Sequence, residues 1–414
     1  MARFWFVSAP LLSHLDWGGF LRTAVQLHKD GHEVLWISGE PVRAVLEANG
    51  IPFVAIAETG WQSTPPPPLD LTTLTPAQAM FLRYQRGLDV WMSVERVTHA
   101  TQALLDLTLD HPKPDVIVTD PYLTTTALVA EIFAVPLVVV GYPALAKPND
   151  EVLYPIQQIQ SDESRTRLQQ LFRHFGIQGM NFSDGATPSL LSPSLHLNYF
   201  TKEWYWAEQL ALLDQNVFVG GTPERATPPN PAWLDAIPND MPLGFITLGL
   251  SYTGELGFFA WAAHAVARAG MIPIVVIGNQ PIALDKKQEL VRALPKTARL
   301  LNGVNLAQVL PRTQLAIHHG GLGVTHALLL RGILQMVVPH STEQRLHAKR
   351  VATAKVGLNL SAIDVRRGKL AEGTLALVQD QRVQQTAQAF AESMIDAGGV
   401  ATATQHLLRI ADAR

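Results

Sequence analysis

Short apolar runs alternate with amphipathic segments along much of the chain. Near the N-terminus, strand-like and helix-like patterns follow one another over residues 4–8, 19–29, 33–37 and 41–49. The same unit returns over residues 116–119, 124–133 and 137–140. Strands that alternate with helices of this length form parallel sheets, since each helix carries the chain back to the start of the next strand. The pattern therefore predicts an α/β fold with a Rossmann-like N-terminal domain.

A second α/β series begins after a proline-rich passage that contains few strand-like runs. Its first strand, helix and strand are predicted over residues 244–248, 260–268 and 272–277. Between residues 149 and 206 the periodicity is weaker, and we expect helices and loops there. The predicted organisation is an N-terminal domain over 1–220, a linker over 221–242, a C-terminal domain over 243–395 and a final helical segment over 396–414.

The most informative segment is His-His-Gly-Gly-Leu-Gly-Val-Thr-His, over residues 318–326. An apolar strand over 315–317 precedes it and an apolar helix over 327–330 follows it. Glycines let the backbone turn sharply and approach a ligand closely, and the first N–H groups of the next helix attract anions. The pattern favours a phosphate site, although a glycine-rich turn alone is also typical of an ordinary strand-to-helix connection.

The flanking residues extend this pattern. Gly332, an apolar strand over 335–338, Pro339 and the pair Glu343-Gln344 follow the turn, and a Val-Asn-Leu-Ala-Gln-Val-Leu-Pro segment over 304–311 precedes it. The order resembles the nucleotide-sugar motif of the family 1 glycosyltransferases, which runs His-Gly-Gly-x-Gly-Thr, helix, Gly, apolar strand, Pro, then Asp or Glu and Gln. The antibiotic and macrolide branch of that family commonly carries a second His, which falls here at His326.

The resemblance implies the GT-B architecture, in which two Rossmann-like parallel-sheet domains face a central cleft. It also implies that the last helix, near residues 402–413, crosses back to the N-terminal domain. The nucleoside diphosphate sugar would be bound by the C-terminal domain. The residues that the resemblance places there are Ser251, Thr253, Val304, His319, Gly320, Gly321, Gly323, Val324, Thr325, Glu343 and Gln344.

Each group of donor-site residues has an implied task. His319 and the backbone N–H groups of residues 323–325 would stabilise the charge that grows on the leaving phosphate. Glu343 and Gln344 would bind sugar hydroxyls, although an isolated Glu-Gln pair is usually only surface polarity. Ser251 and Thr253, in a loop that matches the family's Gly-Ser/Thr loop imperfectly, would reach a phosphate.

His14 is the candidate catalytic base, because it follows the first strand, where ligands bind in open α/β sheets. Taken alone, a loop histidine is more often a surface residue, but the resemblance implies a catalytic His at this point, usually in a Gly-His-x-x-Pro segment that the residues after His14 do not match. Asp120 ends the strand 116–119, where the resemblance implies a carboxylate that fixes the histidine tautomer. The competing interpretation of Asp120 is a cap for the helix near Thr124, and Asp16 is a rival partner for His14.

Three residues depart from the family pattern. The phosphate-binding Ser or Thr falls at Val324, which has no hydroxyl, and the adjacent Thr325 is the candidate replacement. The aromatic residue that stacks on the base falls at Gly303, and the ribose-binding Glu falls at Ala327. Recognition of the base would then rest on backbone groups near Val304, so the identity of the donor stays open.

Aromatic side chains in the N-terminal domain are candidates for an acceptor site. The selected residues are Trp61, Phe81, Trp91 and Tyr142. Aromatic residues more often belong to a core than to a ligand wall. A macrolide, a polyphenol, a sterol and a carotenoid all fit such a site, and the segment 8–14 is also similar to bacterial carotenoid glucosyltransferases.

Composition restricts the other classes of function. The 414 residues carry a net charge of −3 and include 47% hydrophobic and 16% charged side chains, so no basic surface for nucleic acid is expected. The absence of cysteine excludes disulfides and thiolate metal sites. We expect a cytoplasmic protein without a signal peptide or transmembrane segment, with peripheral membrane contact left open. The chain contains no Asp-x-Asp triplet, so neither a metal nor a cofactor is expected.

The predicted activity is an inverting, metal-independent transfer of a hexose from a UDP- or dTDP-sugar to a hydroxyl of a hydrophobic small molecule. One alternative is a catalytically silent relative that activates a partner transferase, and the departures at Val324, Gly303 and Ala327 motivate it. Another is a nucleotide-sugar epimerase of the same architecture. The presence of both His14 and Asp120 favours the transferase, because a silent helper needs no base.

Overall fold

The structure is a computed structural model that describes residues 1–12, 15, 18–64, 66–70, 72–146, 155–185, 188–208, 211–223, 229–249, 256–279 and 281–413. The chain divides into two compact units. The first consists of Met1–Tyr199, Leu210–Val219 and Gly398–Arg414, and the second of Phe200–Gln209 and Gly220–Ala397. The C-terminal helix therefore groups with the N-terminal part of the chain, and each unit is described by itself below.

The first unit is built on a parallel sheet whose described strands run in the order β3-β2-β1-β4-β5-β6-β7. The strands are β1 (Arg3–Val7), β2 (Glu33–Ser38), β3 (Phe53–Ala55), β4 (Val116–Thr119), β5 (Leu137–Val140), β6 (Leu195–Asn198) and β7 (Asn216–Phe218). The central strands β4 and β5 are buried at every position, as expected for apolar runs covered by helices on both faces.

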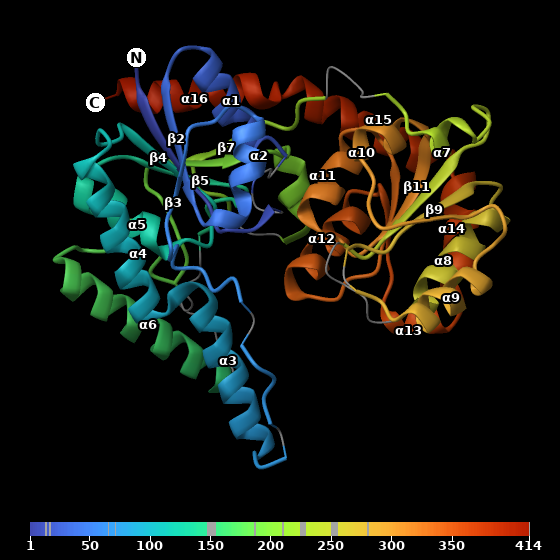
Figure 1. The fold of residues 1–414 in the computed structure, drawn as a ribbon, viewed down its shortest axis with the longest axis horizontal. Coiled ribbons are helices and arrows are strands. Elements are labelled where there is room, and N and C mark those ends of the chain that lie inside the picture. The colour runs from blue at the N-terminus through green and yellow to red at the C-terminus, as the bar shows by residue number, and fades with distance from the viewer. Residues whose placement is uncertain are drawn as a thin grey trace. The chain divides into compact units, whose positions relative to one another are not determined.

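Helices cover this sheet, and α1 lies beside the C-terminal α16 while α4 packs on α5 and α6 (Figure 1). Their bounds are α1 (Phe20–Lys29), α2 (Arg43–Ala48), α3 (Pro76–Met92), α4 (Val94–Asp106), α5 (Thr124–Phe133), α6 (Pro155–Phe175) and α16 (Gly399–Asp412), with 3-10 turns η2 (Glu40–Val42) and η3 (Leu107–Leu109). Helix α3 begins with a capping box of Thr75 and Gln78 and points away from the sheet (Figure 1).

The second unit has its own parallel sheet, with the described strands in the order β10-β9-β8-β11-β12-β13. The strands are β8 (Leu243–Thr247), β9 (Ile272–Val276), β10 (Arg299–Leu301), β11 (Thr313–His318), β12 (Leu334–Val337) and β13 (Gly357–Asn359). Apolar residues of β8, β9 and β11 form a buried core with Val309, Leu328 and Ile333 from the elements packed on them.

Among the helices of the second unit, α8 packs on α9 and α14, and α11 packs on α12 and α15. The bounds are η4 (Lys202–Glu208), α7 (Ala232–Asp235), α8 (Leu256–Arg268), α9 (Leu284–Ala293), α10 (Leu306–Val309), η5 (Leu310–Arg312), α11 (Leu322–Leu329), α12 (Thr342–Thr353), α13 (Ala362–Arg366), α14 (Lys369–Gln379) and α15 (Gln381–Asp396). The α/β class predicted from the sequence is confirmed.

In each sheet the strand order reverses direction at one place. The reversal lies between β1 and β4 in the first unit and between β8 and β11 in the second. Chain segments that leave the carboxyl ends of two such strands diverge to opposite faces of the sheet and leave a crevice, which is where ligands bind in open α/β sheets. Asp120 follows β4 and His319 follows β11, so both predicted residues lie at these positions.

Candidate functional site

The glycine-rich turn connects β11 to α11. Gly320 has φ +91°, a left-handed conformation that side chains other than glycine rarely adopt, and α11 already begins at Leu322. The sequence pattern predicted a helix only from residue 327, because the glycines preceding it are poor helix formers. Gly321 is the N-cap, and no side chain accepts a hydrogen bond there from the first turn of the helix. The helix therefore begins without a side-chain cap.

The N–H groups that this helix start leaves unpaired differ from those predicted. The N–H of Thr325 donates to the carbonyl of Gly321 at 3.0 Å and so begins the helical hydrogen bonds. The groups before it, on Leu322, Gly323 and Val324, are the ones that an α-helix leaves without an intrahelical partner. The predicted set 323–325 is therefore shifted by one residue toward the N-terminus.

Thr325 does not replace the hydroxyl that is missing at Val324. Its side chain is fully buried, and its hydroxyl donates to the carbonyl of Gly321 at 2.8 Å. The hydroxyl group is thus used within its own helix. Val324 is half-buried and packs against the core of the second unit.

His319 lies between two glycines. A Cβ atom built on Gly321 would come within 2.5 Å of its Nε2, and one built on Gly249 within 3.1 Å. Burial, and secondly the nearby His340, lower the pKa of His319 to about 4, so the ring is neutral at pH 7. Within the described part of the chain its Nδ1 has no hydrogen-bond partner. The ring also has a hydrogen bond with the backbone of Thr247, so its unpaired Nδ1, rather than a fixed charge, is what it offers beside the turn.

Two buried histidines hold the backbone of Gly320. Its N–H donates to Nδ1 of His318 at 3.2 Å, and its carbonyl accepts a 2.7 Å hydrogen bond from Nδ1 of His347, on α12. The other ring nitrogen of His318 donates to Oε1 of Gln335 at 3.0 Å. Sequence reasoning missed His347 and Gln335, since neither lies in the motif and only the folded chain brings them to Gly320.

Helix α12 carries the predicted sugar-binding pair. Gln344 forms a capping box with Ser341, and its Oε1 accepts hydrogen bonds from the N–H groups of His340 at 2.8 Å and Ser341 at 3.2 Å. Its backbone lies against Gly320, where a Cβ would come within 3.0 Å of the Gln344 carbonyl oxygen. Glu343 is exposed in the first turn of α12. The Gln344 oxygen thus caps the helix, and its amide NH2 group is the part left for a ligand.

Two further positions, Val304 and Gly303, are described, whereas four other predicted residues lie outside the described residues. Val304 is half-buried against the core of the second unit. Gly303 is exposed, with open space where a side chain would begin. The predicted residues His14, Asp16, Ser251 and Thr253 lie outside the described residues.

Asp120 is fully buried at the end of β4. Its Oδ2 accepts a hydrogen bond from the N–H of Ala9 at 2.8 Å, and its Oδ1 accepts one from the N–H of Tyr122 at 2.9 Å. Leu123 is the N-cap of α5, and no side chain caps that helix. The alternative interpretation of Asp120 as the cap of this helix is therefore wrong.

Two of the predicted acceptor-site aromatics share one environment. Trp61 and Trp91 are half-buried against the core of the first unit, and the ring of Trp61 lies 5.4 Å from that of Tyr122. Phe81 is half-buried on α3, and Tyr142 has 37% of its surface exposed. Tyr122 links Trp61 to Asp120, because its ring lies beside that of Trp61 and its N–H donates to the Asp120 carboxylate.

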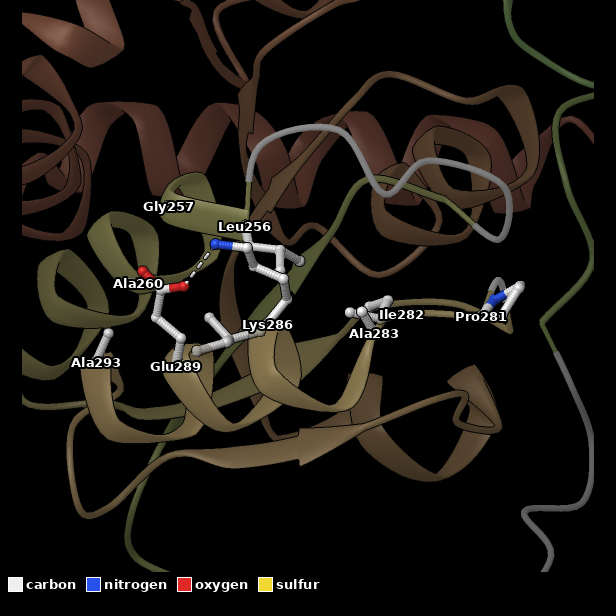
Figure 2. A pocket seen from close by; sticks show the side chains of 10 residues that line it. Leu256, Gly257, Ala260, Pro281, Ile282, Ala283, Lys286, Glu289 and Ala293 are labelled. Atoms are coloured by element: carbon white, nitrogen blue, oxygen red, sulfur yellow. Dashed lines mark hydrogen bonds and ion pairs between the residues drawn. The ribbon is translucent and has the colours of Figure 1, made fainter.

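A cavity of about 550 Å³ lies between α8 and α9 (Figure 2). Its walls are mainly apolar, and the two charged side chains, Lys286 and Glu289, form an ion pair at 3.0 Å. None of the predicted site residues lines it. In the described ranges, no group of three or more His, Asp or Glu side chains could hold a metal ion. No described helix is long and apolar enough to cross a membrane.

Comparison with known proteins identifies relatives of this chain. Residues 274–407 match the family described as erythromycin biosynthesis protein CIII-like, C-terminal domain. Demethyllactenocin mycarosyltransferase of Streptomyces fradiae is 26% identical over 74% of the chain and 66% of its own length, just under two thirds. The elloramycin glycosyltransferase ElmGT of Streptomyces olivaceus is 27% identical over 86% of each chain.

Solved structures resemble the whole chain. The glycosyltransferase of kitacinnamycin has a TM-score of 0.75 at 17% identity and covers 99% of both chains. The calicheamicin glycosyltransferase CalG4 has a TM-score of 0.72 at 18% identity, covering 99% of this chain and 98% of its own. The spinosyn rhamnosyltransferase SpnG, solved with thymidine diphosphate, has a TM-score of 0.69 at 18% identity. The match covers 98% of this chain and 99% of the SpnG chain. At these identities the likeness establishes the fold.

Proposed function

We propose that this chain, which belongs to the family 1 glycosyltransferases and has their GT-B fold, transfers a hexose from a UDP- or dTDP-sugar to a hydroxyl of a hydrophobic small molecule. One observation carries the proposal. The glycine turn after β11 presents the unpaired N–H groups of α11 and the neutral His319 at the switch point of the second sheet. This arrangement suits a diphosphate.

The reaction proceeds with inversion and without a metal ion. His14 removes the proton from the acceptor hydroxyl, whose oxygen then bonds to the anomeric carbon. The bond from that carbon to the phosphate oxygen breaks, and the nucleoside diphosphate leaves. Asp120 holds the histidine tautomer and stabilises the imidazolium that forms. Its position at the end of β4, joined to the end of β1, supports this assignment.

Negative charge grows on the leaving diphosphate as the bond breaks. The N–H groups of Leu322, Gly323 and Val324, together with His319, are fixed in advance by the turn and need little reorganisation. Gly320 and Gly321 allow the close approach, and Glu343 with the amide of Gln344 binds the sugar hydroxyls. Trp61 and Trp91 are the preferred wall for an apolar acceptor, because Trp61 lies near Asp120 through Tyr122.

The test is release of nucleoside diphosphate from UDP-glucose and dTDP-glucose with a panel of macrolide, polyphenol, sterol and carotenoid alcohols. We expect release that depends on the acceptor and is abolished in His14→Ala. His99→Ala, which changes an exposed histidine on α4 of the same unit, is the matched control and should keep full activity. Turnover that survives in His14→Ala would contradict the assigned base. Wild-type protein that releases no diphosphate with any pair would favour the silent partner protein.

A further inference from the structure

We propose that His347 is a positioning residue for the donor diphosphate, because it fixes the peptide between Gly320 and Gly321 and thereby the direction of the phosphate-binding N–H groups. The inference rests on the proposed function and adds to it a residue outside the sequence motif. His347 lies on α12, 3% exposed, and touches the turn through its Nδ1.

The hydrogen bonds around Gly320 determine the tautomers of both histidines. Nδ1 of His318 accepts from the Gly320 N–H, so its proton is on Nε2, which donates to Gln335. Nδ1 of His347 must carry a proton, because its partner is a carbonyl oxygen 2.7 Å away. Gly320 is therefore held at both its N–H and its carbonyl by buried rings, and it keeps φ +91°.

Fixing the Gly320 carbonyl also fixes the next N–H group. The peptide bond is planar and trans, so the carbonyl of Gly320 and the N–H of Gly321 point in opposite directions. With the carbonyl directed at His347, the Gly321 N–H points away from α12. That N–H donates to no backbone carbonyl within the described ranges, and Gly321 is the N-cap of α11. With the N–H groups of the first turn of α11, it is thus available to donate to the proposed diphosphate.

The environment of His347 explains why an apolar residue would not serve. Without the ring N–H, the buried Gly320 carbonyl would lose its side-chain donor, and the peptide would be free to rotate toward another partner. Burial, and secondly Arg350, lower the pKa of His347 to about 4, so the ring is neutral at pH 7 and acts through its N–H rather than through charge. The side-chain amide of asparagine can place a donor close to the position of Nδ1, whereas that of glutamine extends further.

The experiment is calorimetric titration of UDP and dTDP into wild type, His347→Asn, His347→Leu and His347→Gln, after thermal melting has shown which variants are folded. We expect His347→Leu and His347→Gln to bind the preferred nucleotide about tenfold more weakly, and His347→Asn to bind within about threefold of wild type. Steady-state kinetics should show the same order in the KM for the donor, with a smaller change in the KM for the acceptor.

Equal affinities of wild type and His347→Leu would overturn the inference. So would equal weakening in the asparagine and leucine variants, since that result would trace the effect to ring volume. If the leucine variant does not fold, the comparison of asparagine with glutamine decides, and equal binding by these two would contradict the role of Nδ1. A wild type that binds neither nucleotide would instead count against the proposed function itself.

Discussion

Oδ2 of Asp120 lies 2.8 Å from the backbone nitrogen of Ala9, so a buried carboxylate joins the carboxyl ends of β1 and β4. The bond spans the switch point of the first sheet, and the other carboxylate oxygen accepts the N–H of Tyr122. Asp120 therefore anchors the backbone at Ala9, just after β1, and is also the proposed partner of the base. The structural role predicts that a substitution lowers stability, and the catalytic role predicts that it lowers turnover.

Asp120→Asn should lower both stability and turnover. An amide can accept only one of the two N–H groups, which should cost roughly 1–3 kcal/mol of unfolding free energy. Loss of the charge behind the histidine should lower kcat roughly 10²–10⁴-fold with little change in the KM for the donor. Asp115→Asn is the control at the other end of β4: it loses its pairing with Arg3 but should keep kcat. A folded Asp120→Asn variant with normal kcat would exclude the catalytic role.

His319→Ala should weaken binding of the nucleoside diphosphate. Loss of one hydrogen bond to a charged phosphate is worth roughly 1.5–3 kcal/mol, or about 10- to 100-fold in Kd. Calorimetric titration with UDP and dTDP measures this directly. His264→Ala, on α8 of the same unit, removes a ring that contacts only the carbonyl of Ala293 among the hydrogen bonds described and should leave Kd unchanged. Equal Kd values for His319→Ala and wild type would place the diphosphate elsewhere.

Val324→Thr should strengthen donor binding. The substitution adds a hydroxyl of nearly the same volume in the first turn of α11, where the family carries a phosphate-binding Ser or Thr. A roughly tenfold lower KM for the donor is expected from one added hydrogen bond to a charged group. Thr325→Val provides the comparison, because the hydroxyl it removes is bonded to Gly321 within the helix. That variant should lose stability without losing donor affinity. Weaker donor binding at unchanged stability would instead identify Thr325 as the phosphate ligand.

Gly320→Ala should destabilise the second unit by roughly 1–3 kcal/mol. The left-handed backbone disfavours any side chain, and the added Cβ would meet Val337 at 2.9 Å and the Gln344 carbonyl oxygen at 3.0 Å. Gly323→Ala is the matched substitution three residues away. Its Cβ meets nothing within 4 Å and it lies in a helix, so stability should stay level or rise slightly. Urea unfolding of both variants checks the difference, and equal losses would argue against strain at Gly320.

Stability should fall as the pH drops below about 6.5. Burial is the main cause that lowers the pKa of His196 and His347 to about 4 and of His318 to about 3. Below pH 6.5 the unfolded chain binds protons at these rings while the folded chain does not, so protons favour unfolding. Each ring should contribute up to about 1.4 kcal/mol of loss per pH unit until its folded pKa is reached. Urea unfolding between pH 7.5 and 5 measures the slope, which His347→Asn should reduce by one such contribution. An unchanged slope in that variant would contradict the contribution assigned to His347.

The sequence predicted the central elements of the first sheet closely. The expected strands and helix over 116–119, 124–133 and 137–140 coincide with β4, α5 and β5. These segments are apolar because both faces of the sheet are covered, which makes the pattern strong. The edge strands β3 and β10 were not predicted: each has three half-buried residues, too few for an alternation to stand out.

The candidate site was predictable only where residues adjacent in the sequence form it. A glycine turn between a strand and a helix is a local pattern, and it located Gly320 and His319. The start of α11 was placed too late, because tertiary packing overrides the low helix propensity of Gly323. The contact of His347 with Gly320 joins residues that are 27 positions apart in the sequence and lie on different elements. No local sequence pattern predicts such a contact.

The division of the chain into units limits how its two halves can be exchanged with those of relatives. The chain passes between units after Tyr199, Gln209, Val219 and Ala397, so neither unit is one continuous stretch. A chimera joined at a single point near residue 220 would supply the N-terminal unit with a foreign last helix, against the face formed with α1. An exchange of the whole second unit therefore requires residues 200–209 and 220–397 to be replaced together. Residues 398–414 must stay native, because they belong to the first unit.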